Sequence, residues 1–120
     1  AKDGRALLTR PEQRTLGGAS PDRSGKYVYC IIQSTKPTSF GAIGIGAEPM
    51  EVYTIGYQDI AAVVSDTPLE VYDPTRENVL SHEGVNERVM HDYTVIPMSF
   101  GTVFKTADDI VELLRSAYGA

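Results

Sequence analysis

The sequence contains a single cysteine, Cys30, and no apolar run long enough to cross a bilayer. One cysteine cannot form a disulfide within the chain, and such sparing use is typical of proteins from reducing compartments. A transmembrane helix needs about 18 or more consecutive apolar residues. The 120 residues therefore indicate one globular domain with a modest core.

Basic residues are scarce outside the first part of the chain. Residues 1–25 contain five basic and three acidic residues, a balance of +2, whereas residues 26–120 contain six basic and thirteen acidic residues, a balance of −7. Nucleic-acid phosphates and anionic lipid surfaces both require clustered Lys and Arg. We therefore expect neither nucleic acid nor a membrane as a partner.

Motifs for catalysis and metal binding are also missing. The pair His82-Glu83 begins like the zinc-protease helix motif, but the position of the second histidine is occupied by Asn86. The three glycines of segment 34–50 match the spacing of neither the G-x-G-x-x-G nor the G-x-x-x-x-G-K-[ST] phosphate-binding motif. We expect no catalytic residue, no cofactor and no metal, and hence no enzyme. His82 and Asn86 are expected to bond to backbone or loop groups at a helix–sheet boundary.

Four segments have the apolar pattern of β-strands. Residues 26–33 are apolar on both sides, which is typical of a central strand covered on both faces. Segments 51–58 and 60–65 predict a hairpin. Residues 94–104 alternate, with Ile96, Met98, Phe100 and Phe104 expected on one side. Pro97 lacks the N–H that a ladder needs, so this strand is expected at a sheet edge.

Two segments predict helices. Asp73 followed by proline predicts an N-cap and a helix over 74–92. Gly84 interrupts this helix, which suggests a close backbone contact. A capping sequence at Thr106 predicts a second helix over 107–118.

The element order predicts an α+β fold with a four-stranded antiparallel sheet and two helices. The expected spatial order of the strands is 94–104, 26–33, 60–65 and 51–58, with the loop 34–50 in place of a helix. The side chains expected to be largely buried are Ile32, Ile55, Val64, Val89, Met98, Phe100 and Leu113.

Residues 1–25 have scattered charges, two prolines and a glycine pair. This composition predicts a disordered leader or tail, followed by a domain over 26–120. A partner-binding arm is the alternative.

Three sequence blocks resemble the N-terminal domain of the gas vesicle protein F/L family over about residues 26–118. The blocks are Tyr27-Val-Tyr-Cys-Ile-Ile32, then Val52-Tyr-Thr-Ile55 with Ile60-Ala-Ala-Val-Val-Ser-Asp66, and Asn86-Glu-Arg-Val-Met90 with Val95-Ile-Pro-Met-Ser-Phe-Gly-Thr-Val-Phe104. The resemblance implies a ferredoxin-like variant whose first helix is replaced by a loop. The sequence departs from the family pattern in its leader, in stopping before the family's second, more helical domain, and in Ser99, where a basic residue is expected in many members.

The resemblance also implies a function. Family members are cytoplasmic, gas vesicle associated accessory proteins of vesicle assembly, and they are not known as enzymes. Their N-terminal domain is thought to contact the small hydrophobic shell protein. The implied partners are the shell protein and other gas vesicle accessory proteins. A small ligand-binding regulatory module with the loop 34–50 as a lid is the alternative function.

An exposed strand edge can bind a partner strand through main-chain hydrogen bonds. Segment 51–58 has no proline and no charge between Glu51 and Asp59, so it is expected to be the open edge. We expect the shell subunit, or a second copy, to dock on residues Val52, Tyr53, Thr54, Ile55 and Tyr57. The alternative is that the loop 34–50 caps this edge and that the tyrosines pack under a helix.

Overall fold

The computed structural model describes residues 25–46, 48–68 and 72–118. Its elements are β1 (Gly25–Gln33), β2 (Ser39–Ala42), β3 (Glu51–Tyr57), β4 (Ile60–Thr67), α1 (Arg76–Met90), β5 (Val95–Pro97), β6 (Val103–Phe104) and α2 (Ala107–Tyr118). The leader predicted at 1–25 lies outside the described residues, apart from Gly25.

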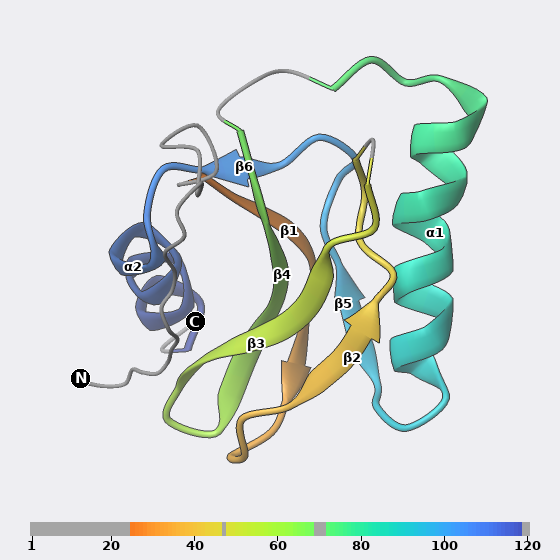
Figure 1. Cartoon of the computed structure of the whole chain (residues 1–120). Helices are drawn as coiled ribbons and strands as arrows, with labels where there is room; N and C mark the ends of the chain where they lie inside the picture. Colours follow the sequence, from red (N-terminus) through yellow and green to blue (C-terminus); the bar gives the residue numbers. More distant parts are fainter. Residues whose placement is uncertain (1–24, 47, 69–71, 119–120) are drawn as a thin grey trace.

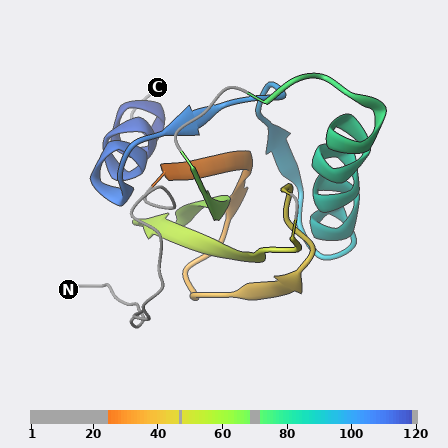
Figure 2. The same cartoon turned by 45° about the horizontal axis from the view of Figure 1, so that its top comes forward.

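The strands form one antiparallel sheet with the order β2-β3-β4-β1-β5, and β6 also pairs with β1. Helix α1 packs on one face of the sheet and α2 on the opposite face, as Figures 1 and 2 show. The architecture is α+β and is a ferredoxin-like variant. The predicted strand order, with β1 inside the sheet and the Pro97 strand at an edge, is confirmed.

Two features of the sheet differ from the prediction. The segment 34–50 was expected to be a loop throughout, but residues 39–42 form strand β2. The segment 94–104 was expected to be one strand, but it is divided into β5 and β6. The sheet therefore has six strands rather than four.

The interruption between β5 and β6 follows from the backbone hydrogen bonds on either side of it. The Met98 N–H donates to the Tyr29 carbonyl at 3.0 Å, and the Val28 N–H donates to the Thr102 carbonyl at 2.9 Å. Residues 99–101, between β5 and β6, thus lie between two hydrogen bonds that involve adjacent residues of β1. Gly101 has a φ of 87°, a left-handed conformation that glycine adopts without a steric penalty. The chain consequently bends out of the sheet at this point.

This bend places the apolar side chains of the segment in different surroundings. Phe100 packs against the cluster under α1, whereas Met98 and Phe104 pack against the cluster under α2. Ile96 is 65% exposed. The prediction that these four side chains share one buried side is therefore wrong, because strict alternation ends where the strand ends.

The core consists of two clusters, one on each face of the sheet. Val85 and Val89 of α1 belong to the first, and Ile110 and Leu114 of α2 belong to the second. Of the predicted core, the fully buried members are Ile32, Val64 and Val89. The partly buried members, at the rims of the two clusters, are Ile55, Met98, Phe100 and Leu113.

Helix α1 begins two residues later than the sequence pattern predicted. Thr75 is the N-cap, and its side chain accepts a hydrogen bond of 3.1 Å from the Asn78 N–H. The Asp73 carbonyl instead accepts a hydrogen bond of 2.9 Å from the Asn78 side chain. Helix α2, in contrast, has the predicted cap, since the Asp109 N–H donates to the Thr106 hydroxyl at 3.1 Å.

Gly84 has no close backbone neighbour, contrary to expectation. A Cβ atom at this position of α1 would meet no atom within 4 Å outside its own helix. Gly84→Ala should therefore raise the free energy of unfolding by about 0.5–1 kcal/mol, because alanine loses less backbone entropy in a helix. Urea denaturation would measure this gain.

Gly44→Ala is the matched control for that substitution. Its Cβ would lie 2.9 Å from the Met50 carbonyl oxygen and 3.0 Å from the Ser65 Cβ. This variant should be destabilised. A lower urea midpoint for Gly84→Ala would contradict the open surroundings of that residue.

Candidate functional site

The β3 edge predicted to be open is paired with β2. Ser39 lies opposite Tyr53 and Gly41 opposite Val52. Beyond this ladder, the Thr54 N–H donates to the Thr38 carbonyl at 3.1 Å. The expectation of an open edge is therefore wrong for this half of β3, and the alternative of capping by segment 34–50 is confirmed. The cause is a short extended stretch whose Phe40 side chain is buried in the α1-side cluster.

The five residues predicted to bind a partner do not share one surface. Val52 is fully buried in the α1-side cluster. Tyr53, Ile55 and Tyr57 pack against the α2-side cluster, as the alternative with tyrosines under a helix expects. The Thr54 hydroxyl accepts a hydrogen bond of 3.0 Å from the Thr38 N–H. Docking of a partner on these residues stays a prediction.

Tyr53 already has a structural role. Its hydroxyl donates to Asp66 at 2.5 Å, and Lys26 donates to the same carboxylate oxygen at 2.8 Å. The Tyr57 ring contacts the Tyr118 ring edge-on at a centroid distance of 5.8 Å. Tyr53 and Tyr57, two of the residues predicted to bind a partner, thus connect β3 to neighbouring elements of the same domain.

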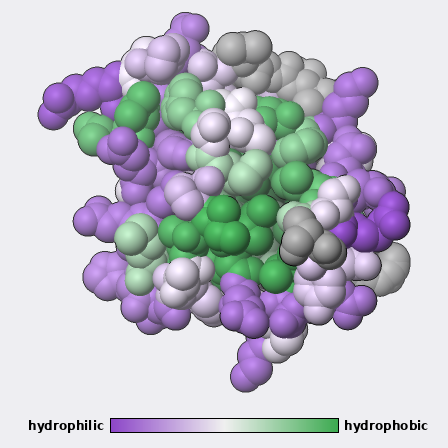
Figure 3. Space-filling view, turned by 180° about the vertical axis from the view of Figure 1, so that it is seen from behind, coloured by the Kyte–Doolittle hydropathy of each residue, from purple (hydrophilic) through white to green (hydrophobic). Residues whose placement is uncertain are grey.

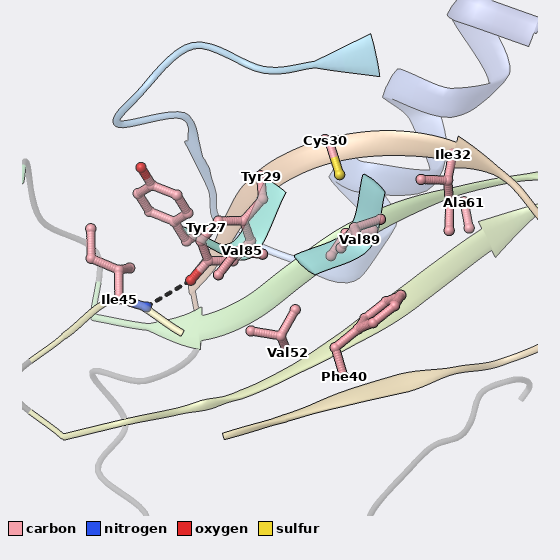
Figure 4. Close-up of a cluster of buried hydrophobic side chains, with 11 residues drawn as sticks. Tyr27, Tyr29, Cys30, Ile32, Phe40, Ile45, Val52, Ala61, Val85 and Val89 are labelled. Carbon is pink, nitrogen blue, oxygen red and sulfur yellow. Dashed lines mark hydrogen bonds between the residues drawn. The ribbon is translucent and has the colours of Figure 1, made fainter. Parts of the chain in front are cut away.

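Two tyrosines of β1 form hydrogen bonds with loops of the domain through their hydroxyl groups. This role was not predicted from the sequence. A bulge between Val28 and Cys30 lets Tyr29 and Cys30 face the α1-side cluster together. The Tyr29 hydroxyl accepts a hydrogen bond of 2.8 Å from the Ile45 N–H, shown in Figure 4, and lies 2.7 Å from the Ser65 hydroxyl. Burial raises the pKa of Tyr29 to about 12.

This bond fixes the loop 34–50 to the core. Ile45 is only 1% exposed, and the Gly44 N–H donates to the Met50 carbonyl at 2.8 Å. A lid has to move away from its site to admit a ligand. Anchoring of this kind argues against the loop as the lid of a small-molecule site.

The second tyrosine forms a buried network with His82. The His82 Nε2 lies 3.0 Å from the Met98 carbonyl, which can only accept, so Nε2 carries the proton. The Nδ1 atom then accepts a hydrogen bond of 2.9 Å from the Tyr27 hydroxyl, which itself accepts one of 3.0 Å from the Gly101 N–H. The network joins β1, α1 and the bend after β5, so the prediction that His82 bonds to backbone at a helix–sheet boundary is confirmed. The same prediction is wrong for Asn86, whose Nδ2 lies 3.5 Å from the His82 ring and whose buried Oδ1 has no hydrogen-bond partner among the described residues.

The same network predicts a pH dependence of stability. Burial lowers the pKa of His82 below its usual 6.5, while the bond to Met98 and the nearby Glu83 act in the opposite direction. As the pH falls below about 6.5, the unfolded chain binds a proton that the folded chain does not. The free energy of unfolding should therefore decrease from pH 7 to the lowered pKa.

Two histidine variants test the origin of that decrease. Urea unfolding at several pH values should show it in His91→Gln, because His91 is exposed. His82→Asn should lose this component. An unchanged pH dependence in His82→Asn would assign the effect to other groups.

The remaining candidates for catalysis or metal binding, the thiol of Cys30 and possible metal ligands, have no chemical role among the described residues. Cys30 is fully buried, and burial raises the pKa of its thiol to about 12, so a thiolate is disfavoured. No group of three or more His, Cys, Asp or Glu that could hold a metal occurs among residues 25–46, 48–68 and 72–118. In the same ranges, no helix has both the length and the apolar character of a membrane span.

Comparison with known proteins identifies relatives of this domain. The family described as gas vesicle synthesis protein GvpL/GvpF matches residues 25–120. Gas vesicle protein F1 of Halobacterium salinarum is 39% identical over 97 residues, which cover 76% of this chain and 43% of that protein. Gas vesicle protein L1 of the same organism is 27% identical over 106 residues, which cover 84% of this chain and 38% of that protein.

A solved structure shows the same fold. The crystal structure of the gas vesicle protein GvpF from Anabaena sp. PCC7120 aligns with a TM-score of 0.66 and 30% sequence identity, over 80% of this chain and 39% of that chain. The chain thus spans about two fifths of the length of the relatives that it matches. Sequence and structure agree that this chain belongs to the GvpL/GvpF family of gas vesicle synthesis proteins.

Proposed function

We propose that the chain is part of a non-enzymatic accessory protein of gas vesicle assembly that binds the hydrophobic shell subunit. The observation that carries this proposal is the match of nearly the whole domain to the GvpL/GvpF family, at 39% identity to a gas vesicle protein F1. Other gas vesicle accessory proteins are its further partners. Its place of action is the cytoplasm, at growing vesicles.

The chemistry of the described residues fits a binding role better than catalysis. His82, Tyr27 and Tyr29 bond to loops and helices of their own domain and are buried. A catalytic site would bring a nucleophile, a base and a stabilising donor to one accessible place. The two-sided core instead provides a rigid support for a recognition surface.

Gene deletion tests the assembly role. In a host that carries a complete gas vesicle gene set, removal of the gene for this protein should abolish intact vesicles in electron micrographs. The full-length wild-type gene should restore them, while the amount of shell protein stays the same. Vesicles of normal number and shape in the deletion strain would contradict the proposal.

Binding of the shell subunit needs a separate experiment. Tagged full-length protein, co-expressed with the shell subunit, should retain it during purification in a stoichiometric ratio. Failure of the shell subunit to co-purify, together with loss of vesicles in the deletion strain, would leave an assembly role without shell binding.

A further inference from the structure

Residues 98–102, which we call the strap, connect β5 to β6 along the sheet edge that these two strands form. Figure 3 looks onto the side of β5 and β1, where apolar residues gather inside a hydrophilic border. Ser99 and Gly101 of the strap are exposed, whereas His82 on its inner side is only 7% exposed. The strap thus separates the buried imidazole from water.

Three contacts of the strap depend on His82. The Met98 carbonyl accepts a hydrogen bond of 3.0 Å from the His82 Nε2. The Phe100 ring packs edge-on against the imidazole at a centroid distance of 5.8 Å. The Gly101 N–H donates to the Tyr27 hydroxyl, which in turn donates to the Nδ1 atom. The closed strap therefore fits a neutral imidazole whose Nδ1 accepts a hydrogen bond.

The strap backbone is attached to β1 mainly at its two ends. The Met98 N–H donates to β1 at 3.0 Å, and the Thr102 carbonyl accepts from β1 at 2.9 Å. Between these bonds, the Gly101 N–H bonds to a side-chain hydroxyl instead of a backbone carbonyl. Exposed segments with sparse backbone pairing open at a lower free energy than core strands do. The middle of the strap can therefore open while the rest of the sheet stays paired.

Asn86 adds a polar group that the closed strap leaves unsatisfied. It lies one turn after His82 on α1, and its Nδ2 is 3.5 Å from the His82 Nε2. Its Oδ1 is buried and has no hydrogen-bond partner among the described residues. A buried oxygen without a partner destabilises the closed state, because water would satisfy it. Entry of water beside His82 relieves this penalty.

A protonated His82 does not fit the closed strap. An imidazolium donates from both of its nitrogens, so Nδ1 no longer accepts from the Tyr27 hydroxyl. The Tyr27 proton then loses its acceptor, since the other partner of this hydroxyl, the Gly101 N–H, is a donor. A buried charge is also costly unless an opposite charge pairs with it. The closed state consequently excludes the charged form.

Among the described residues, the titratable groups around His82 supply no buried counter-charge. Those on β1 are Tyr27, Tyr29 and Cys30. Burial raises the pKa of Tyr27 above its usual 10 and the pKa values of Tyr29 and Cys30 to about 12, so all three are neutral at pH 5–8. Tyr72 contributes a phenol that lies edge-on to Tyr27 and bonds to a threonine hydroxyl. Glu83 follows His82 on α1 but is exposed to water.

We propose that the strap is an acid-sensitive closure, which opens locally when His82 takes up a proton. In the open state the imidazole contacts water, and its pKa returns toward the usual 6.5. Because the open state binds the proton and the closed state does not, the open population rises as the pH falls below about 6.5. The rise is at most about tenfold per pH unit and ends at the lowered pKa of the closed state.

Hydrogen exchange of the full-length protein at about pH 7.5 and pH 5.5 tests this opening. Rates are expressed as protection factors, which remove the intrinsic effect of pH on exchange. The protection factor of the Gly101 amide should fall by up to about tenfold between the two conditions. An unchanged protection factor at Gly101 would overturn the proposal.

Low concentrations of urea distinguish local opening from global unfolding. A local opening exposes little surface, so the protection factor of Gly101 at pH 5.5 should not depend on urea. The reference is the amide of Ala62, which is fully buried in β4 between β1 and β3. Its protection factor should be higher and should fall with urea. Equal protection and equal urea dependence at the two amides would show that the strap opens only on global unfolding, which would overturn the proposal.

The two histidines provide the matched variants. His82→Asn should abolish the pH dependence of the Gly101 protection factor, whereas His91→Gln should keep it, because His91 is exposed. Proton NMR of the wild-type imidazoles gives a second readout that needs no variant, and the His82 ring should titrate below pH 6.5. Persistent pH dependence in His82→Asn would overturn the proposal, as would a His82 ring that titrates at or above pH 6.5.

Discussion

Leu114→Ala should lower the free energy of unfolding by about 2–5 kcal/mol, as substitutions of buried leucine by alanine do. Leu114 and Ile110 are fully buried and lie one turn apart on α2. They fasten this helix to the sheet, so the loss of one leaves a cavity under a helix of only 12 residues. A loss of this size is a large part of the stability of a small domain.

Urea denaturation followed by circular dichroism would measure this loss. Leu80→Ala is the control, because Leu80 is 52% exposed and its truncation removes little packing. The account of α2 fails if Leu114→Ala and Leu80→Ala have the same unfolding midpoint.

Tyr27→Phe should destabilise the protein by about 1–3 kcal/mol for each buried partner that loses its hydrogen bond. The Tyr27 hydroxyl has two partners, the buried His82 Nδ1 and the part-buried Gly101 N–H, so the larger share of this loss comes from His82. Phenylalanine keeps the ring and its packing but satisfies neither group. The bend after β5 should also exchange its amide hydrogens faster in this variant.

Tyr93→Phe provides the comparison for that experiment. The Tyr93 ring packs edge-on against Phe40 at 6.1 Å, and no hydrogen bond of its hydroxyl occurs among the described residues. Its unfolding midpoint should stay close to that of wild type. Equal stability of Tyr27→Phe and wild type would show that water or another group replaces the hydroxyl.

The sequence was sufficient for the strand order because each strand has a distinct pattern. β1 is apolar on both sides and lies inside the sheet, while Pro97 marks an edge strand. The hairpin of β3 and β4 turns at residues 58–59 as predicted. These features depend on which residues occur within one segment, so the hydrophobic periodicity of that segment predicts them.

Features that depend on long-range pairing could not be predicted from the same patterns. Residues 39–42 contain three small residues and only one bulky apolar side chain, Phe40, so nothing local indicates a strand. Their pairing with β3 is what closes the predicted open edge. The buried hydroxyls of Tyr27 and Tyr29 depend on the bulge in β1, which a regular alternation does not show.

Hydrogen exchange of the full-length protein, with and without the shell subunit, tests the central claim most directly. The account predicts slower exchange at a contiguous set of surface amides in the presence of the shell subunit. Equal exchange at every amide in the two samples would contradict shell binding.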